Sequence, residues 1–169
     1  MKPNAIVYTS NTGYTAEYAS LLGRETGLPV YSLEKALKNV ALGTEVIYLG
    51  WLMASFIRGY DKAAKRFKIC AVCGVGTGEN GSQHPEVRKN NKISGDVPLF
   101  TLRGGLDMNK LKGLYKFMMN IVVKKLADDL YQKEQRTAEE EVTLGLLVHG
   151  GNCVSAENLA PVIDWYKNE

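Results

Sequence analysis

Short apolar runs alternate with amphipathic stretches along the first two thirds of the chain. Strands that are apolar at nearly every position are typical of strands buried on both faces, and regular strand and helix alternation is typical of right-handed crossovers. The pattern predicts an α/β fold with a parallel sheet and helices on both of its faces. The predicted strands are residues 5–8, 30–31, 46–49, 69–75 and 97–102, and the helices between them are residues 12–26, 33–40, 56–67 and 85–90.

The last third of the chain is mostly helical in pattern, with a long helix beginning near Asp107. Thr137 and Glu140 have the spacing of a capping box, which predicts a helix through Leu147 that stops at the glycine pair 150–151. Residues 142–148 would also fit a strand, although we favour helix. Ser155 is expected to cap a final helix over residues 157–166. Because no repeat or Pro/Gly/Ser linker interrupts the chain, we expect residues 1–169 to form one domain.

The first predicted strand leads into a hydroxyl-rich loop that is followed at once by a helix. A helix N-terminus offers unpaired backbone N–H groups and the positive end of the helix dipole, and the hydroxyls add further donors. The loop has no Lys or Arg, so neutral donors alone would hold a phosphate there. The alternative is a capped turn without a ligand. The residues of this predicted phosphate site are Thr9, Ser10, Asn11, Thr12, Gly13, Tyr14 and Thr15.

Residues 10–15 match the pattern T/S-x-T-G-x-T, and the loop resembles the FMN phosphate loop of the flavodoxin family. It has neither the three glycines of a dinucleotide-binding loop nor the lysine of a nucleotide P-loop, which argues against NAD and ATP. The resemblance implies FMN as the cofactor. It also implies a flavodoxin-like fold with three layers, in which a doubly wound, five-stranded parallel sheet has the order 2-1-3-4-5.

Two later loops are expected to enclose the flavin ring, because ligands of doubly wound sheets lie beyond the carboxyl ends of the strands. In residues 50–55, Trp51 is placed to stack on the ring, with ordinary packing as the alternative. In residues 74–81, glycines would bring backbone N–H groups to the ring edge, with a flexible turn as the alternative. No aromatic residue follows Gly74 before Ser82 to cover the second face. The predicted ring-binding residues are Gly50, Trp51, Leu52, Met53, Gly74, Val75, Gly76, Thr77 and Gly78.

The chain after the fifth predicted strand is similar to a subgroup of flavodoxin-domain proteins that includes the bacterial menaquinone-dependent protoporphyrinogen oxidase. With the phosphate loop, this similarity extends over nearly the whole chain. It implies an alternative function as a peripheral-membrane, quinone-dependent enzyme. The similarity rests on the glycine pair 104–105, on a basic helix with Tyr115, Phe117, Met118 and Met119, and on the C-terminal helix that begins with Glu157, Asn158, Leu159, Ala160 and Pro161.

The segment Leu111–Leu126 is apolar over most of its circumference and basic towards its ends. Such a helix could lie on an anionic membrane surface, or beside a quinone or porphyrin. We favour a core helix whose lysines extend to solvent, because a domain of this size must bury its longest helix. Membrane contact through Leu111–Leu126 is therefore not favoured. Its basic residues are Lys110, Lys112, Lys116, Lys124 and Lys125.

Composition excludes several classes of protein. Hydrophobic residues make up 45% and charged residues 23% of the chain, as in ordinary globular domains. The net charge of +3 suggests an acidic partner or an anionic lipid surface without requiring either, and no basic block interleaved with aromatic residues indicates nucleic acid. The N-terminus has no run of signal-peptide length and no stretch suits a membrane-spanning helix, so a cytoplasmic location is expected.

The cysteines and histidines give no sign of a metal site or of a catalytic acid or base. Cys70 and Cys73 lie within an apolar run, so we expect small, buried, reduced thiols rather than a redox or metal-binding pair. His84 and His149 are expected to be structural. The expected function is therefore electron transfer by bound FMN, with a redox protein or a small donor or acceptor such as a quinone as partner. A cofactor-free interaction module is the least favoured alternative.

Overall fold

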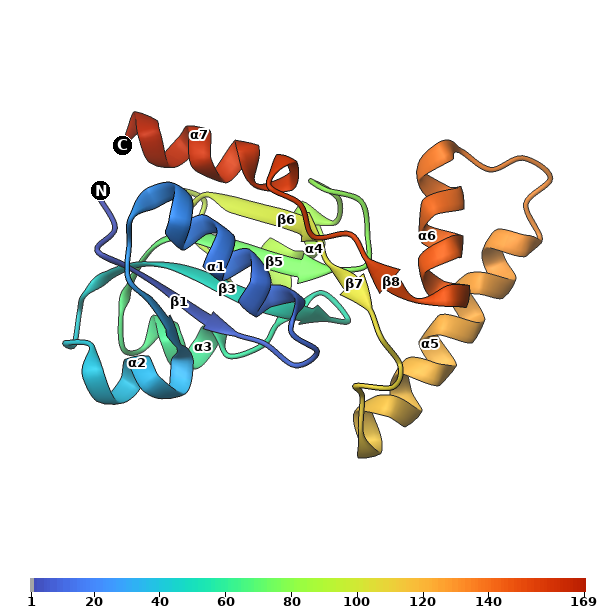
Figure 1. The fold of residues 1–169 in the computed structure, drawn as a ribbon, viewed down its shortest axis with the longest axis horizontal. Coiled ribbons are helices and arrows are strands. Elements are labelled where there is room, and N and C mark those ends of the chain that lie inside the picture. The colour runs from blue at the N-terminus through green and yellow to red at the C-terminus, as the bar shows by residue number, and fades with distance from the viewer. Residues whose placement is uncertain (1) are drawn as a thin grey trace.

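The computed structural model describes residues 2–169 and has an α/β fold built on a mostly parallel sheet (Figure 1). The parallel strands have the order β2-β1-β3-β5-β6, and the short strand β4 pairs antiparallel with the end of β3. The predicted five-stranded parallel sheet and its order are confirmed. The strands are β1 Ala5–Thr9, β2 Val30–Ser32, β3 Glu45–Met53, β4 Phe56–Ile57, β5 Lys68–Gly76 and β6 Leu99–Arg103.

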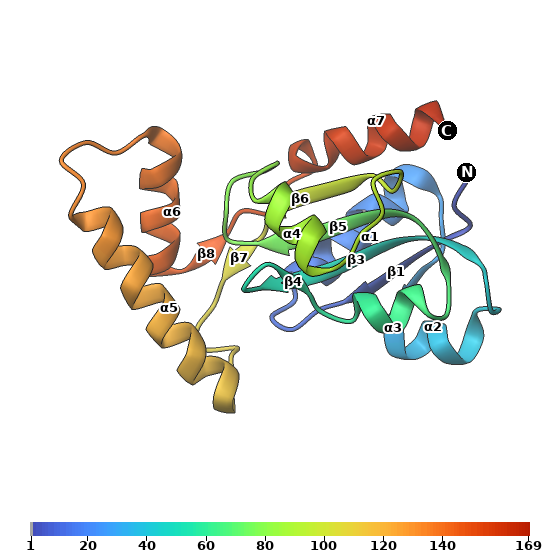
Figure 2. The same ribbon diagram turned by 180° about the vertical axis from the view of Figure 1, so that it is seen from behind.

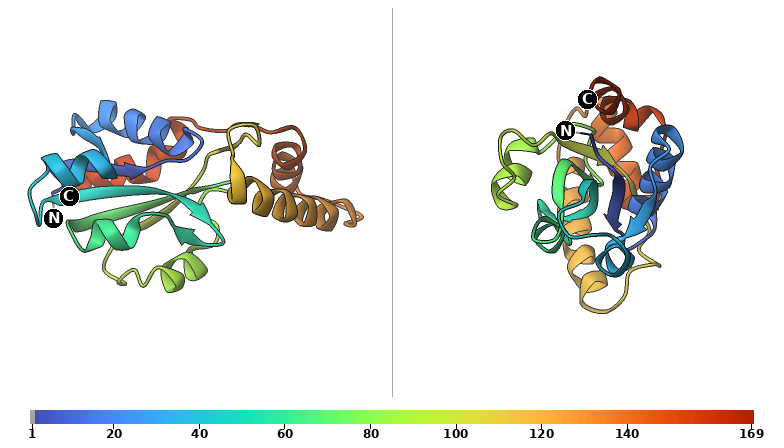
Figure 3. Two further views of the ribbon diagram at one scale, coloured as in Figure 1. Left: turned by 90° about the horizontal axis from the view of Figure 1, so that it is seen from below. Right: turned by 90° about the vertical axis from the view of Figure 1, so that its left-hand side faces the viewer.

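Helices cover both faces of the sheet, which gives the predicted three layers. On one face α1 (Tyr14–Thr26) and α7 (Ala160–Asn168) pack on buried residues such as Ile6 and Ile47. On the other face lie α2 (Leu33–Asn39), α3 (Tyr60–Ala64) and α4 (His84–Asn90). The left view of Figure 3 shows α1 and α4 on opposite sides of the sheet. Burial of both faces explains why the strands are apolar at successive positions.

Helices α5 (Gly113–Tyr131) and α6 (Ala138–His149) form a hairpin beyond the carboxyl ends of the strands (Figures 1 and 2). An antiparallel pair, β7 (Gly105–Leu106) and β8 (Gly151–Asn152), joins this hairpin to the sheet. A small apolar cluster between the two helices contains Leu106, Leu146 and Leu147. No helix within residues 2–169 combines the length and the apolar character needed to cross a bilayer.

The prediction that the helix of residues 111–126 lies in the core is wrong. Ala127 is the only residue of α5 that is buried, and Leu114 and Phe117 are 70% and 63% exposed. The physical reason is that α1 and α7 already cover one face of the sheet, while α2, α3 and α4 cover the other. The inserted hairpin therefore has no sheet face left to occupy, and α5 packs mainly on α6.

Two other predictions concern segment boundaries. The expected helix over residues 56–67 begins later, because Ala54 and Ser55 adopt positive φ values of 49° and 64° and turn the chain into β4. The Asn91 side chain holds this turn, accepting from the Ile57 N–H at 2.8 Å and donating to the Ser55 carbonyl at 2.8 Å. The capping box at Thr137 is confirmed, and residues 142–148 are helical.

Near the C-terminus the Ser155 hydroxyl accepts from the Asn158 N–H, as expected of a cap. The final helix is split, however, into a 3-10 turn (Glu157–Leu159) and α7.

Candidate functional site

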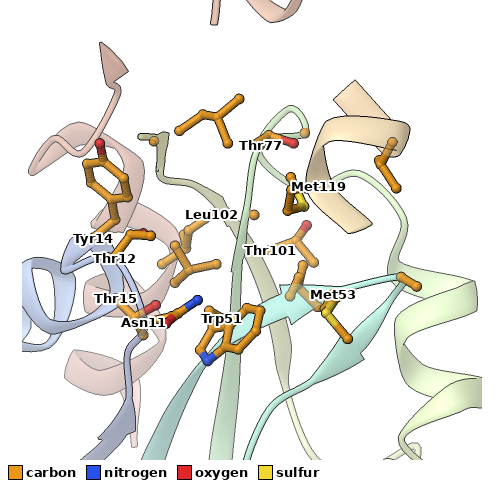
Figure 4. A pocket seen from close by; sticks show the side chains of 18 of the residues that line it. Asn11, Thr12, Tyr14, Thr15, Trp51, Met53, Thr77, Thr101, Leu102 and Met119 are labelled. Carbon is orange, nitrogen blue, oxygen red and sulfur yellow. The ribbon is translucent and has the colours of Figure 1, made fainter. Parts of the chain in front are cut away.

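A cavity of about 370 Å³ lies at the carboxyl end of the sheet. Strand β1 has β2 as its neighbour on one side and β3 on the other, so the order in which successive strands are added reverses at β1. This reversal of strand order is the place where open α/β sheets bind ligands. The walls come from the loop after β1, the ends of β3 and β5, and helix α5 (Figure 4). The volume suits a small organic ligand.

The loop after β1 forms the first wall, to which it contributes Asn11, Thr12, Tyr14 and Thr15. Within residues 2–169 the side chains of Asn11, Thr12 and Thr15 have no hydrogen-bond partner. The backbone N–H groups of Tyr14, Thr15 and Ala16, in the first turn of α1, also have no acceptor in that part of the chain. These donors meet at the N-terminus of α1, where a helix favours an anion.

Three residues of the predicted phosphate loop do not line the cavity: Thr9, Ser10 and Gly13. The Thr9 hydroxyl lies 2.8 Å from the Tyr48 hydroxyl, and the Ser10 hydroxyl accepts from the Gly13 N–H at 3.2 Å. Gly13 has a φ of 103°, a backbone conformation that favours glycine. These three residues therefore shape the loop, while its next residues face the cavity.

Tyr14 connects this loop to the segment that leads into the hairpin. Its ring packs so close to Gly105 that a Cβ atom there would lie 2.5 Å from the ring. The Lys110 ammonium lies 5.4 Å from the ring centroid and pairs with Asp107, which also lines the cavity. Burial raises the pKa of Tyr14, with Lys110 opposing the shift. Sequence reasoning missed Lys110 and Asp107, because neither belongs to the loop.

The end of β3 and its turn form the second wall, with Trp51, Leu52, Met53, Ala54 and Ser55. Residues 50–53 were expected in a loop, but they belong to β3, because pairing with β4 extends the strand to Met53. Gly50 does not line the cavity. It lies beneath the β3–β4 hairpin, where a Cβ atom would come within 2.7 Å of the Arg58 carbonyl oxygen.

Trp51 makes two contacts at the cavity wall. The Tyr115 ring of α5 meets it edge-on with centroids 5.6 Å apart, and the Arg58 guanidinium lies 5.8 Å from its centroid. Arg58 also donates to the Tyr115 hydroxyl at 3.2 Å. Tyr115 thus supplies an aromatic ring close to Trp51, although it comes from α5 and not from the loop after β5. The sequence could not show this pairing, since the two residues are far apart in the chain.

The end of β5 and the loop after it form the third wall, with Val75, Gly76, Thr77, Gly78 and Glu79. Gly74 does not line the cavity, because the Leu52 side chain lies over it, 3.2 Å from where a Cβ atom would be.

Hydrogen bonds anchor the loop of this third wall. The Arg103 Nε donates to the Gly78 carbonyl at 3.3 Å, and the Asn80 Oδ1 accepts from the Arg103 N–H at 2.6 Å. The Gly81 N–H donates to the Thr101 carbonyl at 2.9 Å. These bonds argue against a freely flexible turn.

Helix α5 forms a fourth wall that the sequence analysis did not assign to the site. Its apolar circumference was the available signal, but we interpreted it as core. Apart from Asp107, the side chains that α5 and the preceding segment bring to the cavity are apolar, and Figure 4 shows Met119 across the cavity from Trp51. They are Leu106, Leu111, Met118, Met119, Val122 and Leu126.

Neither histidine lines the cavity. His84 begins α4, and its Nε2 is buried without a hydrogen-bond partner in the described chain. Burial, assisted by Arg88, lowers its pKa. His149 is the last residue of α6. Residues 2–169 contain no group of three or more His, Cys, Asp or Glu side chains arranged to hold a metal ion.

Comparison with known proteins adds no assignment to this site. No protein-family model matches the chain, and no curated protein matches its sequence.

Proposed function

We propose that this protein binds FMN in the cavity at the carboxyl end of the sheet and transfers electrons through it. One observation carries the proposal: hydroxyls and helix N-terminal N–H groups without partners in residues 2–169 converge beside a cavity walled by Trp51. A phosphate dianion satisfies these donors, and hydrogen bonds to charged groups contribute roughly 1.5–3 kcal/mol each. The residues present therefore fit the phosphate of FMN.

The residues around the cavity have different roles in binding FMN. Thr12 and Thr15 hold the phosphate with the first-turn N–H groups of α1. Trp51 provides a flat apolar surface for the ring, and the backbone of residues 76–78 lies at the polar ring edge. Bound FMN supplies one- and two-electron chemistry, while the protein sets its potential and its access to partners. No side chain of the cavity is required as a catalytic acid or base.

The thiols of Cys70 and Cys73 fit a cytoplasmic location. Both are free and buried in β5, and burial raises the pKa of each. Unpaired cysteines are usual where the thiol pool is kept reduced.

A flavin titration tests the proposal. Purified protein should quench the fluorescence of added FMN, and FMN should bind far better than FAD, because the loop encloses a terminal phosphate dianion and leaves little room for a pyrophosphate to continue. Protein that is still colourless after incubation with excess FMN and removal of the unbound FMN would contradict cofactor binding. FAD binding as tight as FMN binding would contradict the assignment of the loop.

A second candidate is oxidation of a substrate with a large apolar ring system by a quinone, as in the menaquinone-dependent protoporphyrinogen oxidase that the sequence resembles. The apolar wall from α5 favours it, since an electron carrier needs no such wall. Anaerobic assays of the FMN-loaded protein with protoporphyrinogen and a water-soluble quinone would distinguish the two. Turnover that requires both compounds supports the enzyme, whereas exchange of electrons with soluble dyes alone supports the carrier.

A further inference from the structure

The α5–α6 hairpin is connected to the sheet by two chain segments that each contain a glycine pair (Figure 1). One segment follows β6 through Gly104 and Gly105, and the other leaves α6 through Gly150 and Gly151. The pairing of β7 with β8 places the two segments side by side. Gly150 and Gly151 have φ values of 70° and 145°, which residues with a side chain rarely adopt. Because hinges are typically a few residues at the ends of elements, the two glycine pairs have the position and residue type of a hinge.

The hairpin beyond this hinge has an apolar cluster of its own. Leu106, Leu146 and Leu147 are buried in it, and Met119 and Val123 of α5 pack against them. The two helices therefore hold each other in place through side chains that belong to the hairpin itself. A rotation about the hinge moves the hairpin as one body and leaves this cluster buried.

Side-chain contacts on both helices hold the hairpin over the cavity. On α6, the Glu139 carboxylate pairs with the Arg103 guanidinium at 2.7 Å, and we call this ion pair the latch. On α5, the Tyr115 ring meets the Trp51 ring edge-on, and its hydroxyl accepts from Arg58 at 3.2 Å. Between these contacts, α5 faces the cavity with apolar side chains. Contacts of this kind break and form again without unfolding either helix.

Tyr14 connects the loop after β1 directly to the hinge. Its backbone N–H, in the first turn of α1, has no acceptor within residues 2–169, and its side chain lines the cavity. The Tyr14 ring also packs against Gly105, with the Lys110 ammonium 5.4 Å from the ring centroid. An anion bound by this N–H fixes Tyr14 and, with it, the surface on which the hinge rests.

We propose that the α5–α6 hairpin is a lid that rotates about the glycine pairs 104–105 and 150–151, and that a phosphate on the loop after β1 favours its closed position through Tyr14. The latch holds the closed lid, in which α5 completes the cavity. A ligand shifts such an equilibrium only by binding one state better than the other. The closed state offers both the loop and the α5 wall, whereas the open state offers the loop alone. The motion needs no cofactor, but its coupling to phosphate rests on the proposed binding of FMN.

Distances between spin labels, measured by pulsed electron resonance, test the motion. Exposed positions for the labels are Gln132→Cys in the turn between α5 and α6, and Leu42→Cys and Lys89→Cys outside the hairpin, with Cys153→Ser to remove the accessible native thiol. The 12 residues of α6 place the turn about 18 Å from the hinge, so a rotation of about 15° moves it by about 5 Å. Ligand-free protein should show two populations, about 5 Å apart, in at least one distance from position 132. The distance between positions 42 and 89 is the control and should show one.

Changing the latch tests whether it holds the lid. Glu139→Gln should raise the ratio of open to closed protein by roughly threefold or more, because it removes the charge that pairs with Arg103. Glu134→Gln lies on the same hairpin but removes no ion pair of the described chain, and as the matched control it should leave the ratio unchanged. Near-UV circular dichroism confirms that each variant is folded. A single population that Glu139→Gln does not change would overturn the lid.

Ligands test the coupling through Tyr14. FMN should shift the labels to the closed distance, whereas riboflavin, which lacks the phosphate, should shift them much less. Tyr14→Ala should abolish the shift caused by FMN, and Tyr14→Phe, which keeps the ring beside Gly105, is the control and should retain it. FMN that binds without changing the distances would overturn the coupling and leave the proposed function intact. Two populations that respond to Glu139→Gln in protein that binds no FMN would support the lid and contradict the proposed function.

Discussion

The guanidinium of Arg103 at the end of β6 donates to the carboxylate of Glu139 in α6 across 2.7 Å. The Arg103 side chain is only 9% exposed, whereas that of Glu139 is 51% exposed. Arg103 also donates to the Thr143 hydroxyl at 3.3 Å and to the Gly78 carbonyl, so one buried cation connects the hairpin to the loop at the cavity. A buried charge of this kind is costly when its partner is removed.

Glu139→Gln should therefore lower the free energy of unfolding by about 2 kcal/mol, because glutamine keeps an acceptor but leaves the Arg103 charge uncompensated. Urea unfolding followed by near-UV circular dichroism measures the change. Glu134→Gln is the control, since Glu134 is exposed and has no ion pair in the described part of the chain; it should change stability by less than about 0.5 kcal/mol. Equal effects would show that the buried pair contributes no more than a surface charge.

Thr12→Ala with Thr15→Ala should weaken FMN binding by at least ~2 kcal/mol, through two lost hydrogen bonds to a charged group. Riboflavin lacks the phosphate, so its affinity should hardly change, and it serves as the control for indirect damage to the cavity. Ser10→Ala should have a smaller effect on FMN, because that hydroxyl is used within the loop. Fluorescence titration measures the affinity of each variant for FMN and for riboflavin. A similar loss for FMN and riboflavin would place the threonines away from the phosphate.

The two tryptophans offer a matched pair for locating the flavin ring. Trp51 lines the cavity, whereas Trp165 of α7 packs on Phe100 at 6.3 Å. In Trp165→Phe protein, bound FMN should quench nearly all the remaining tryptophan fluorescence and Trp51 should be the emitter. In Trp51→Phe protein the quenching should be weaker and FMN affinity should fall by about 1–2 kcal/mol, from lost stacking. Stronger quenching of Trp165 than of Trp51 would contradict the proposed position of the ring.

Burial should make two of the three cysteines unreactive in the folded protein. It raises the pKa of Cys73 to about 12 and also raises that of Cys70, so both thiols stay protonated at neutral pH. Ellman's reagent should first titrate Cys153, which is partly exposed, and should reach the others only in denaturant. Cys153→Ser should remove the fast phase. Rapid reaction of all three thiols without denaturant would show that β5 opens readily.

The same shift predicts how stability depends on alkaline pH. The thiol of Cys73 stays protonated in the folded state up to a pKa of about 12, while the unfolded thiol ionises near its ordinary value of 9.0. The unfolded state therefore binds fewer protons above that value, and stability should fall as the pH rises from about 9 towards 12. Cys73→Ala should reduce this slope, and urea midpoints across the range measure it.

The sequence alone determined the α/β architecture, because it depends on local patterns. Apolar runs such as residues 69–75 specify doubly buried strands, and their alternation with helices allows few arrangements. The capping box at Thr137 and Glu140 is likewise local, and it correctly located the start of α6. Of the seven residues that local chemistry predicted as a phosphate site in the first loop, Asn11, Thr12, Tyr14 and Thr15 line the cavity, and their role towards a phosphate stays a prediction.

Tertiary structure alone decided the position of α5 and the composition of the cavity. A helix that is apolar on most sides can be buried, cover a cavity or face a lipid surface, and the choice depends on whether the sheet faces are already filled. They are filled by helices from both ends of the chain, so Leu114 is exposed and Met118 lines the cavity. The contacts of Trp51 with Tyr115, and of Arg103 with Glu139, join residues from different elements. The periodicity of apolar residues indicates which face of an element is buried, but it does not indicate which distant element packs against that face.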